Sequence, residues 1–123
     1  VPVIDEKGIH DFGRMTQLME DSRELALSHE LIDRHATLVF HDVPQSRVAL
    51  VGKRSNHGVE LEFPGFDYLG VWTASTEAPF VAVEPWHGCA SAYDEGERFE
   101  EKRSTMVLAP GQSRELAFTI TPF

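Results

Sequence analysis

Alternating apolar and polar residues set the pattern of the chain after residue 36. In one run Val59, Leu61 and Phe63 fall on one side of an extended backbone, and Glu60 and Glu62 fall on the other. This period of two is typical of a strand with one buried face. Similar β-branched and aromatic runs predict further strands at 37–41, 47–51, 69–73, 80–84, 104–109 and 114–121. The pattern predicts an all-β fold, an antiparallel β-sandwich.

Turn residues separate these predicted strands. The segment 52–58 contains Gly, Ser and Asn, which tolerate positive φ, so we predict that it joins two strands into a hairpin. Pro44 and the Pro64-Gly65 pair should interrupt the ladders beside them, because proline lacks a backbone N–H. The segment 85–103 has no sustained period, and we expect a surface loop whose many carboxylates are solvated.

The first 36 residues carry weaker signals. Apolar residues from Phe12 to Leu27 fall near helical spacing, although Gly13 and a dense mix of charges disfavour a helix there. Ser28 is better placed, because its hydroxyl can cap free backbone N–H groups while Leu27 packs onto the first turn. We therefore predict a short helical turn after Ser28.

Length and composition fit one globular unit. The chain has 123 residues, 41% of them hydrophobic, with no internal repeat and no linker that would divide it. Length and composition therefore favour a single domain, 1–123. The first residues lack a Met and the features of a signal peptide, so we expect that further chain preceded them.

Charge and cysteine content exclude several classes of partner. Eleven basic and twenty acidic residues give a net charge of −9, which disfavours nucleic acid. No apolar stretch approaches the roughly 20 residues that cross a bilayer, so no membrane contact is expected. Cys89 is the single cysteine and cannot form an internal disulfide, which fits a reducing, cytoplasmic location.

Glu84 is the residue best placed for acid–base chemistry. It stands at the predicted end of the strand 80–84, before Pro85 and Trp86, where a rigid carboxylate beside an apolar ring can act as a base. Trp86 or Trp72 can stack on the apolar face of a sugar ring. The alternative reading is a solvated glutamate beside a structural tryptophan.

The histidines give no metal site. None of the six lies in a metal-binding spacing, and no nucleotide or hydrolase motif is present, so no metal and no cofactor are expected. His41 and His87 adjoin predicted strand ends, where either can be a general acid or a structural histidine.

Two segments resemble a known family. EFPGFDYLGVWT at 62–73 and APFVAVEPWHG at 78–88 resemble, in order and spacing, the C-terminal signature of bacterial aldose 1-epimerase-like proteins. Weaker likeness extends over nearly the whole chain, at 27–32, 38–47, 99–102 and 108–112. The resemblance implies the C-terminal half of a galactose mutarotase-like β-sandwich of about twice this length.

The resemblance also implies a reaction, the interconversion of the α and β anomers of a free hexose without a cofactor. Glu84 carries over as the base, and the family's general acid is a histidine in an N-terminal motif that this chain lacks. The acid would come from a missing N-terminal half or from a second copy in a homodimer. By their neighbourhood, the expected pocket residues are Asp67, Trp72, Trp86, His87 and Arg47.

Two alternatives remain open. A non-catalytic carbohydrate-binding module would use the same aromatic rim, and the missing acid favours it. A hexose-phosphate epimerase would need a cluster of cations, and Arg47, Lys53 and Arg54 are too few to favour it.

Overall fold

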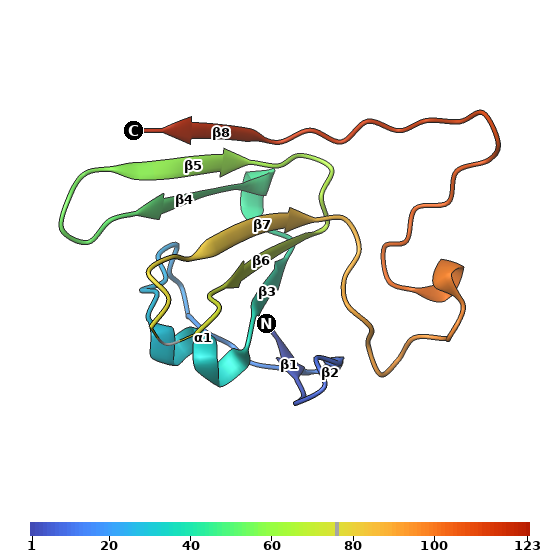
Figure 1. Ribbon diagram of the computed structural model, residues 1–123, viewed down its shortest axis with the longest axis horizontal. Helices are drawn as coiled ribbons and strands as arrows, with labels where there is room; N and C mark the ends of the chain where they lie inside the picture. Colours follow the sequence, from blue (N-terminus) through green and yellow to red (C-terminus); the bar gives the residue numbers. More distant parts are fainter. Residues whose placement is uncertain (76) are drawn as a thin grey trace.

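The structure is a computed structural model that describes residues 1–75 and 77–123. All of its strand pairs are antiparallel and fall into three sheets (Figure 1). One sheet has the order β3-β6-β7, formed by Leu38–His41, Tyr68–Trp72 and Ala82–Trp86. The second has the order β4-β5-β8, formed by Arg47–Val51, Gly58–Glu62 and Thr119–Pro122. A small sheet pairs β1, Pro2–Ile4, with β2, His10–Met15.

The two larger sheets share one hydrophobic core. Leu61 of β5 packs with Leu38 of β3 and with Leu69 and Val71 of β6. Phe63, which follows β5, is 1% exposed and belongs to the same cluster. Because strands of both sheets bury their apolar faces against each other, the predicted all-β class is confirmed and the arrangement is that of a β-sandwich.

The predicted hairpin is also confirmed. β4 pairs with β5 from Arg47 opposite Glu62 to Val51 opposite Gly58. This register places Val48 opposite Leu61 on the core side. The alternation of apolar and polar residues therefore set the faces of this hairpin correctly.

The N-terminal part contains the predicted helical turn, which is longer than expected. The predicted turn after Ser28 is a helix of 7 residues, α1, at His29–His35, and the Leu31 N–H donates to the Ser28 hydroxyl at 3.1 Å. No helix forms from Phe12 to Leu27, as Gly13 and the dense charges indicated. Residues up to Met15 belong to β2, whose pairing with β1 satisfies their backbone groups, and residues 16–27 are in neither helix nor strand.

The C-terminal part has less strand than predicted. The segment 104–109 is not a strand, and of 114–121 only the last residues pair, as the start of β8. Val107 is 74% exposed and Leu108 is 47% exposed. Figure 1 shows this part of the chain making a wide excursion before β8 lies beside β5. A strand pattern without a neighbouring ladder gains neither hydrogen bonds nor burial, so the run stays irregular.

The segment 85–103, predicted as a surface loop, is partly integrated into the fold. Pro85 lies inside β7, opposite Leu69. Proline is tolerated there because β7 is an edge strand. Farther on, Ala92 is buried and forms a parallel bridge with His10, and a short 3-10 helix, η2, covers Phe99–Glu101. Another 3-10 helix, η1, covers Pro44–Ser46.

Within the described residues no helix has the length and apolar character that crossing a membrane requires.

Candidate functional site

Glu84 lies in the middle of β7, not at a strand end as its position before Pro85 predicted. It faces Gly70 across the ladder, and its Oε2 accepts a hydrogen bond of 3.0 Å from the indole Nε1–H of Trp86. Within the described part of the chain, Oε1 takes part in no hydrogen bond or ion pair. The indole thus orients the carboxylate and leaves one oxygen for another group.

Gly70 explains how the indole reaches this position. A Cβ atom at Gly70 would lie 2.4 Å from Cζ2 of Trp86, closer than any real Cβ contact. The absence of a side chain therefore lets the ring lie directly on β6. A glycine inside a predicted strand was the sequence signal for this close approach, and sequence reasoning missed it.

Trp72 shares the sheet face of Glu84. Residues two apart on a strand and residues paired across strands point to the same side, so Gly70 and Trp72 of β6 lie on one face with Glu84 and Trp86 of β7. The ring of Trp72 meets the ring of Phe80 edge to face, with centroids 6.0 Å apart. The structure thus gathers three of the predicted site residues, one carboxylate and two indoles, on a single face.

Asp67 and His87 form a second group just beyond the ends of β6 and β7. His87 Nδ1 lies 3.0 Å from Asp67 Oδ2, and the Asp67 N–H donates to the Trp86 carbonyl at 3.1 Å. The His87 side chain is only 15% exposed. Both residues lie one position beyond the Tyr68–Trp86 pair that ends the ladder of β6 and β7.

Arg47 lies on β4, in the other large sheet. Its guanidinium forms ion pairs with Glu60 and Glu62 of the neighbouring strand. The hydrogen bond to Glu60 raises the pKa of Arg47 above its usual value. The structure therefore does not bring Arg47 to Glu84, and its role in binding stays a prediction.

His41 also keeps a local partner. Its Nδ1 lies 2.7 Å from Asp42 Oδ2, and its backbone pairs with Tyr68, which in turn pairs with Trp86, two residues after Glu84 on β7. Among the described residues no histidine forms a hydrogen bond or ion pair with Glu84. The general acid of the implied reaction therefore has no candidate in direct contact with the base.

A polar cavity of about 590 Å³ opens at the end of β3 and the start of β6. We call it the Arg103 pocket; its lining residues are Phe12, His41, Asp42, Val43, Ser46, Phe63, Phe66, Asp67, Tyr68, Arg103 and Ser104. Asp67, an expected pocket residue, and His41, a candidate general acid, both line it. Sequence reasoning missed this cavity because its walls come from four separate parts of the chain.

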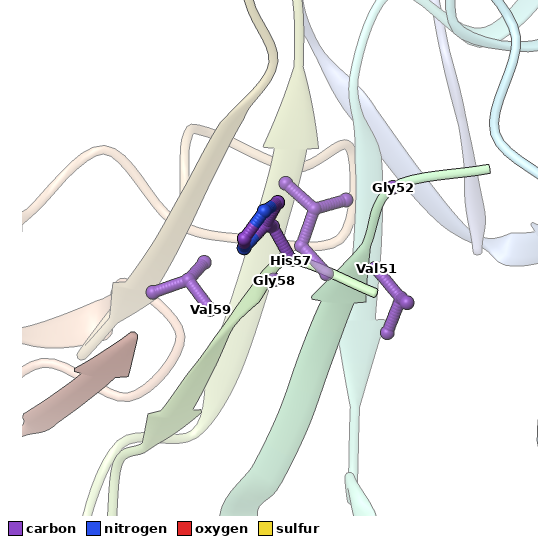
Figure 2. A pocket seen from close by; sticks show the side chains of 6 residues that line it. Val51, Gly52, His57, Gly58 and Val59 are labelled. Carbon is purple, nitrogen blue, oxygen red and sulfur yellow. The ribbon is translucent and has the colours of Figure 1, made fainter. Parts of the chain in front are cut away.

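Another cavity, of about 430 Å³, lies at the turn between β4 and β5 (Figure 2). Its lining is Leu50, Val51, Gly52, His57, Gly58 and Val59. Apart from His57 these side chains are apolar or absent, so the cavity offers little for the recognition of hydroxyl groups.

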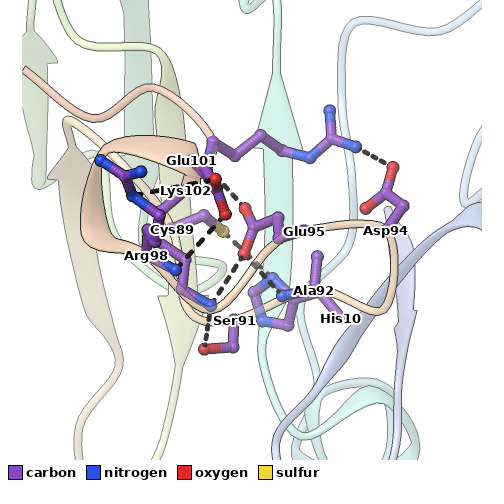
Figure 3. Close-up of polar contacts among 10 residues, drawn as sticks. His10, Cys89, Ser91, Ala92, Asp94, Glu95, Arg98, Glu101 and Lys102 are labelled. Carbon is purple, nitrogen blue, oxygen red and sulfur yellow. Dashed lines mark hydrogen bonds and ion pairs between the residues drawn. The ribbon is translucent and has the colours of Figure 1, made fainter.

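A buried polar cluster joins β2 to the segment after β7 (Figure 3). Glu95, whose side chain is only 4% exposed, accepts the backbone N–H groups of Ala92 at 2.9 Å and Arg103 at 2.7 Å. His10 is 3% exposed, and its Nδ1 lies 3.1 Å from Cys89 Sγ. Burial raises the pKa of the Cys89 thiol to about 11. The expectation of a solvated acidic loop is thus wrong for Glu95, whose carboxylate organises the loop.

His10 should make the stability of the chain depend on pH. Burial lowers the pKa of His10 below its ordinary value of 6.5, although the Glu95 carboxylate opposes this shift. As pH falls below 6.5, His10 takes up a proton in the unfolded chain but not yet in the folded chain. The free energy of unfolding therefore falls as pH drops from 6.5 to the lower pKa that His10 has in the folded chain. We expect a lower melting temperature at about pH 5.5 than at about pH 7.5, measured by circular dichroism.

Burial also lowers the pKa of His35. The difference in melting temperature between the two pH values should therefore shrink in His10→Gln but not vanish. His57, which is exposed, gives the matched control His57→Gln, and this variant should keep the full difference. An unchanged difference in His10→Gln would contradict the assignment to His10.

In the described part of the chain no three His, Cys, Asp or Glu side chains converge to hold a metal ion.

Comparison with known proteins finds two relatives in Lactococcus lactis subsp. lactis. The chromosomal Protein LacX is 28% identical over 116 residues, which are 94% of this chain and 38% of that protein. The plasmid Protein LacX is 27% identical with the same coverage. The chain therefore spans 38% of the length of these curated relatives. No protein-family model and no solved structure matches.

Proposed function

We propose that this chain is the base-carrying part of a mutarotase-like protein that interconverts the anomers of a free hexose. The observation that carries the proposal is the geometry of Glu84, a half-buried carboxylate with one oxygen held by the Trp86 indole and the other unengaged by the described residues. The likeness of 62–73 and 78–88 to aldose 1-epimerases supports the same residue.

The chemistry follows from this arrangement. Glu84 Oε1 takes the proton of the anomeric hydroxyl while an acid protonates the ring oxygen, the ring opens, and rotation about C1–C2 lets it close on the other face. Trp72 and Trp86, on the same sheet face, can stack on the apolar side of the sugar. No cofactor enters this reaction.

No described histidine contacts Glu84, so the acid has to come from elsewhere. An additional N-terminal part or a second copy of the chain can supply it, and the LacX relatives are long enough to contain such a part. Light scattering that finds a dimer would favour the second copy.

A non-catalytic carbohydrate-binding module is the second candidate function. The observation that favours it is the lack of any histidine contact with Glu84 in the described part of the chain. A module of this kind would hold the sugar on the same face through Trp72 and Trp86 without turning it over.

Polarimetry of freshly dissolved α-D-galactose tests the proposal. The chain should accelerate the change in rotation over buffer, and Glu84→Gln should lower the acceleration about 100-fold, within the range for loss of a general base. Gln keeps the size and the hydrogen bond to Trp86 but cannot accept the proton.

The exposed Glu115 provides the matched control, and Glu115→Gln should retain full activity. Equal acceleration by the chain and by Glu84→Gln would exclude Glu84 as the base. No acceleration, together with quenching of tryptophan fluorescence by methyl β-D-galactopyranoside, would mean that this chain alone binds the sugar without turning it over, as a binding module or as a part that needs the acid from elsewhere.

A further inference from the structure

The strand β4 leaves one of its two backbone edges unpaired. It lies at the edge of the sheet β4-β5-β8 and pairs with β5 (Figure 1). The Phe63 N–H donates to the Ser46 carbonyl at 2.8 Å. The Gly52 N–H donates to the His57 carbonyl at 3.0 Å. Because antiparallel pairs alternate in their hydrogen bonding, these two bonds show that the even-numbered residues of β4 direct their backbone groups toward β5.

The odd-numbered residues of β4 direct their backbone groups outward, and these residues are Arg47, Ala49 and Val51. Within residues 1–75 and 77–123, their backbone N–H and C=O groups take part in no hydrogen bond. All three residues are exposed, and Val51 is 56% exposed. A strand edge with free donors and acceptors and without a proline is a template for a further strand.

β8, the opposite edge of the same sheet, is protected by a proline. Gly58 and Phe123 exchange both of their backbone hydrogen bonds, at 2.9 and 3.0 Å, so Pro122 stands at a position that points away from β5. Proline has no N–H, so the outer edge of β8 lacks a donor there. β4 has no such protection, and the two edges of the sheet therefore differ in their capacity to pair.

The two ends of β4 carry opposite charge. Lys53 and Arg54 follow β4 in an exposed turn, where neither forms an ion pair with a described residue. Near the other end, the side chain of Asp42 is 93% exposed, and Glu62 lies opposite Arg47 with its side chain 50% exposed. Antiparallel pairing of two such strands brings each basic end to an acidic end.

We propose that β4 pairs antiparallel with β4 of a second copy of this chain, about a two-fold axis at Ala49. In this register Ala49 faces Ala49 of the second copy, and Arg47 faces Val51 of the second copy. Each unpaired N–H then gains a carbonyl acceptor. On the core side, Val48 faces Leu50 of the second copy, which extends the apolar row beside the cavity of about 430 Å³ that Leu50 lines.

The edge fits a second copy because its pattern is self-complementary. Rotation about Ala49 pairs apolar residues with apolar residues on the core side and unlike charges at the two ends. The assembly should stop at a dimer, because β8 with Pro122 becomes both outer edges of the joined sheet. The inference does not depend on Glu84, which lies in the other large sheet.

Sedimentation velocity of the 123-residue chain over a dilution series tests the proposal. We expect a monomer–dimer equilibrium without larger species. Val51→Lys should weaken dimerisation about 10-fold, because it places an ammonium group opposite Arg47 of the second copy at two symmetric positions. Val107→Lys is the matched control, since Val107 is 74% exposed outside the sheets, and it should dimerise as the unchanged chain does.

Charge reversal supplies a second pair of variants, should Val51→Lys fail to fold. Lys53→Glu should weaken dimerisation, because it removes the attraction between the ends of the two strands. Lys7→Glu changes the net charge equally at an exposed turn outside β4, and it should have a smaller effect. Glu84→Gln should leave dimerisation unchanged, which separates this inference from the proposed function.

Hydrogen exchange at low and high protein concentration locates the contact. The amides of Arg47, Ala49 and Val51 should gain protection as the dimer forms, whereas the amide of Ile120, on the outer edge of β8, should not. Three results would overturn the proposal: a monomer at every concentration, which would leave the edge to a different partner, protection gained at Ile120 and not at Ala49, or equal dimerisation of folded Val51→Lys and Val107→Lys.

Discussion

Phe63→Ala is expected to lower the free energy of unfolding by about 3–5 kcal/mol, the usual cost of removing a buried phenylalanine side chain. Phe63 is 1% exposed and packs in the cluster where β5, β3, β6 and α1 meet. Its backbone also joins separate segments, because its N–H donates to the Ser46 carbonyl at 2.8 Å. A domain of this size has a total stability of about 5–15 kcal/mol, so the variant should be close to unfolding.

Urea denaturation followed by tryptophan fluorescence measures this loss. Phe99→Ala is the matched control, because Phe99 is 76% exposed and should change stability by less than about 0.5 kcal/mol. Similar losses for the two variants would mean that Phe63 does not hold the sandwich together.

Glu95→Ala is expected to destabilise the chain by about 2–4 kcal/mol, mainly in the segment that follows β7. The substitution leaves the N–H groups of Ala92 and Arg103 without their acceptor and removes the ion pair with Lys102, whose Nζ lies 3.8 Å from Glu95 Oε2. Each backbone donor left unsatisfied in a buried position costs about 1–3 kcal/mol.

Hydrogen exchange resolves where this loss falls. The amides of Ala92 and Arg103 should lose protection in Glu95→Ala, whereas the amides of β6 should keep most of theirs. Glu97→Ala, two residues away and exposed, should change neither. Unchanged protection at Ala92 would contradict the role of the Glu95 carboxylate. Loss of protection spread evenly over all sheets would show that the segment does not open as a unit.

The sequence by itself determined the elements whose signals are local. Alternating residues set the faces of β4 and β5, turn residues set their hairpin, and a serine hydroxyl set the start of α1. These features depend on period-two side-chain geometry and on hydrogen bonds within a few residues, so the neighbouring sequence is sufficient to specify them. The shared face of Glu84 and Trp86 was not one of these features, because the sequence predicted a strand ending at Glu84 and a loop from Pro85, whereas β7 continues to Trp86.

Only the tertiary structure decided the features that depend on distant neighbours. Pro85 continues a strand because β7 lies at a sheet edge, and 104–109 forms none because no ladder partner lies beside it in the described chain. Asp67 and Arg103 reach one pocket through the packing of four separate segments. Glu95 accepts backbone N–H groups only 3 and 8 residues away, but its segment contacts the distant strand β2, where His10 forms a bridge with Ala92. Burial and pairing over such separations depend on the whole fold, so the local pattern of residues does not encode them.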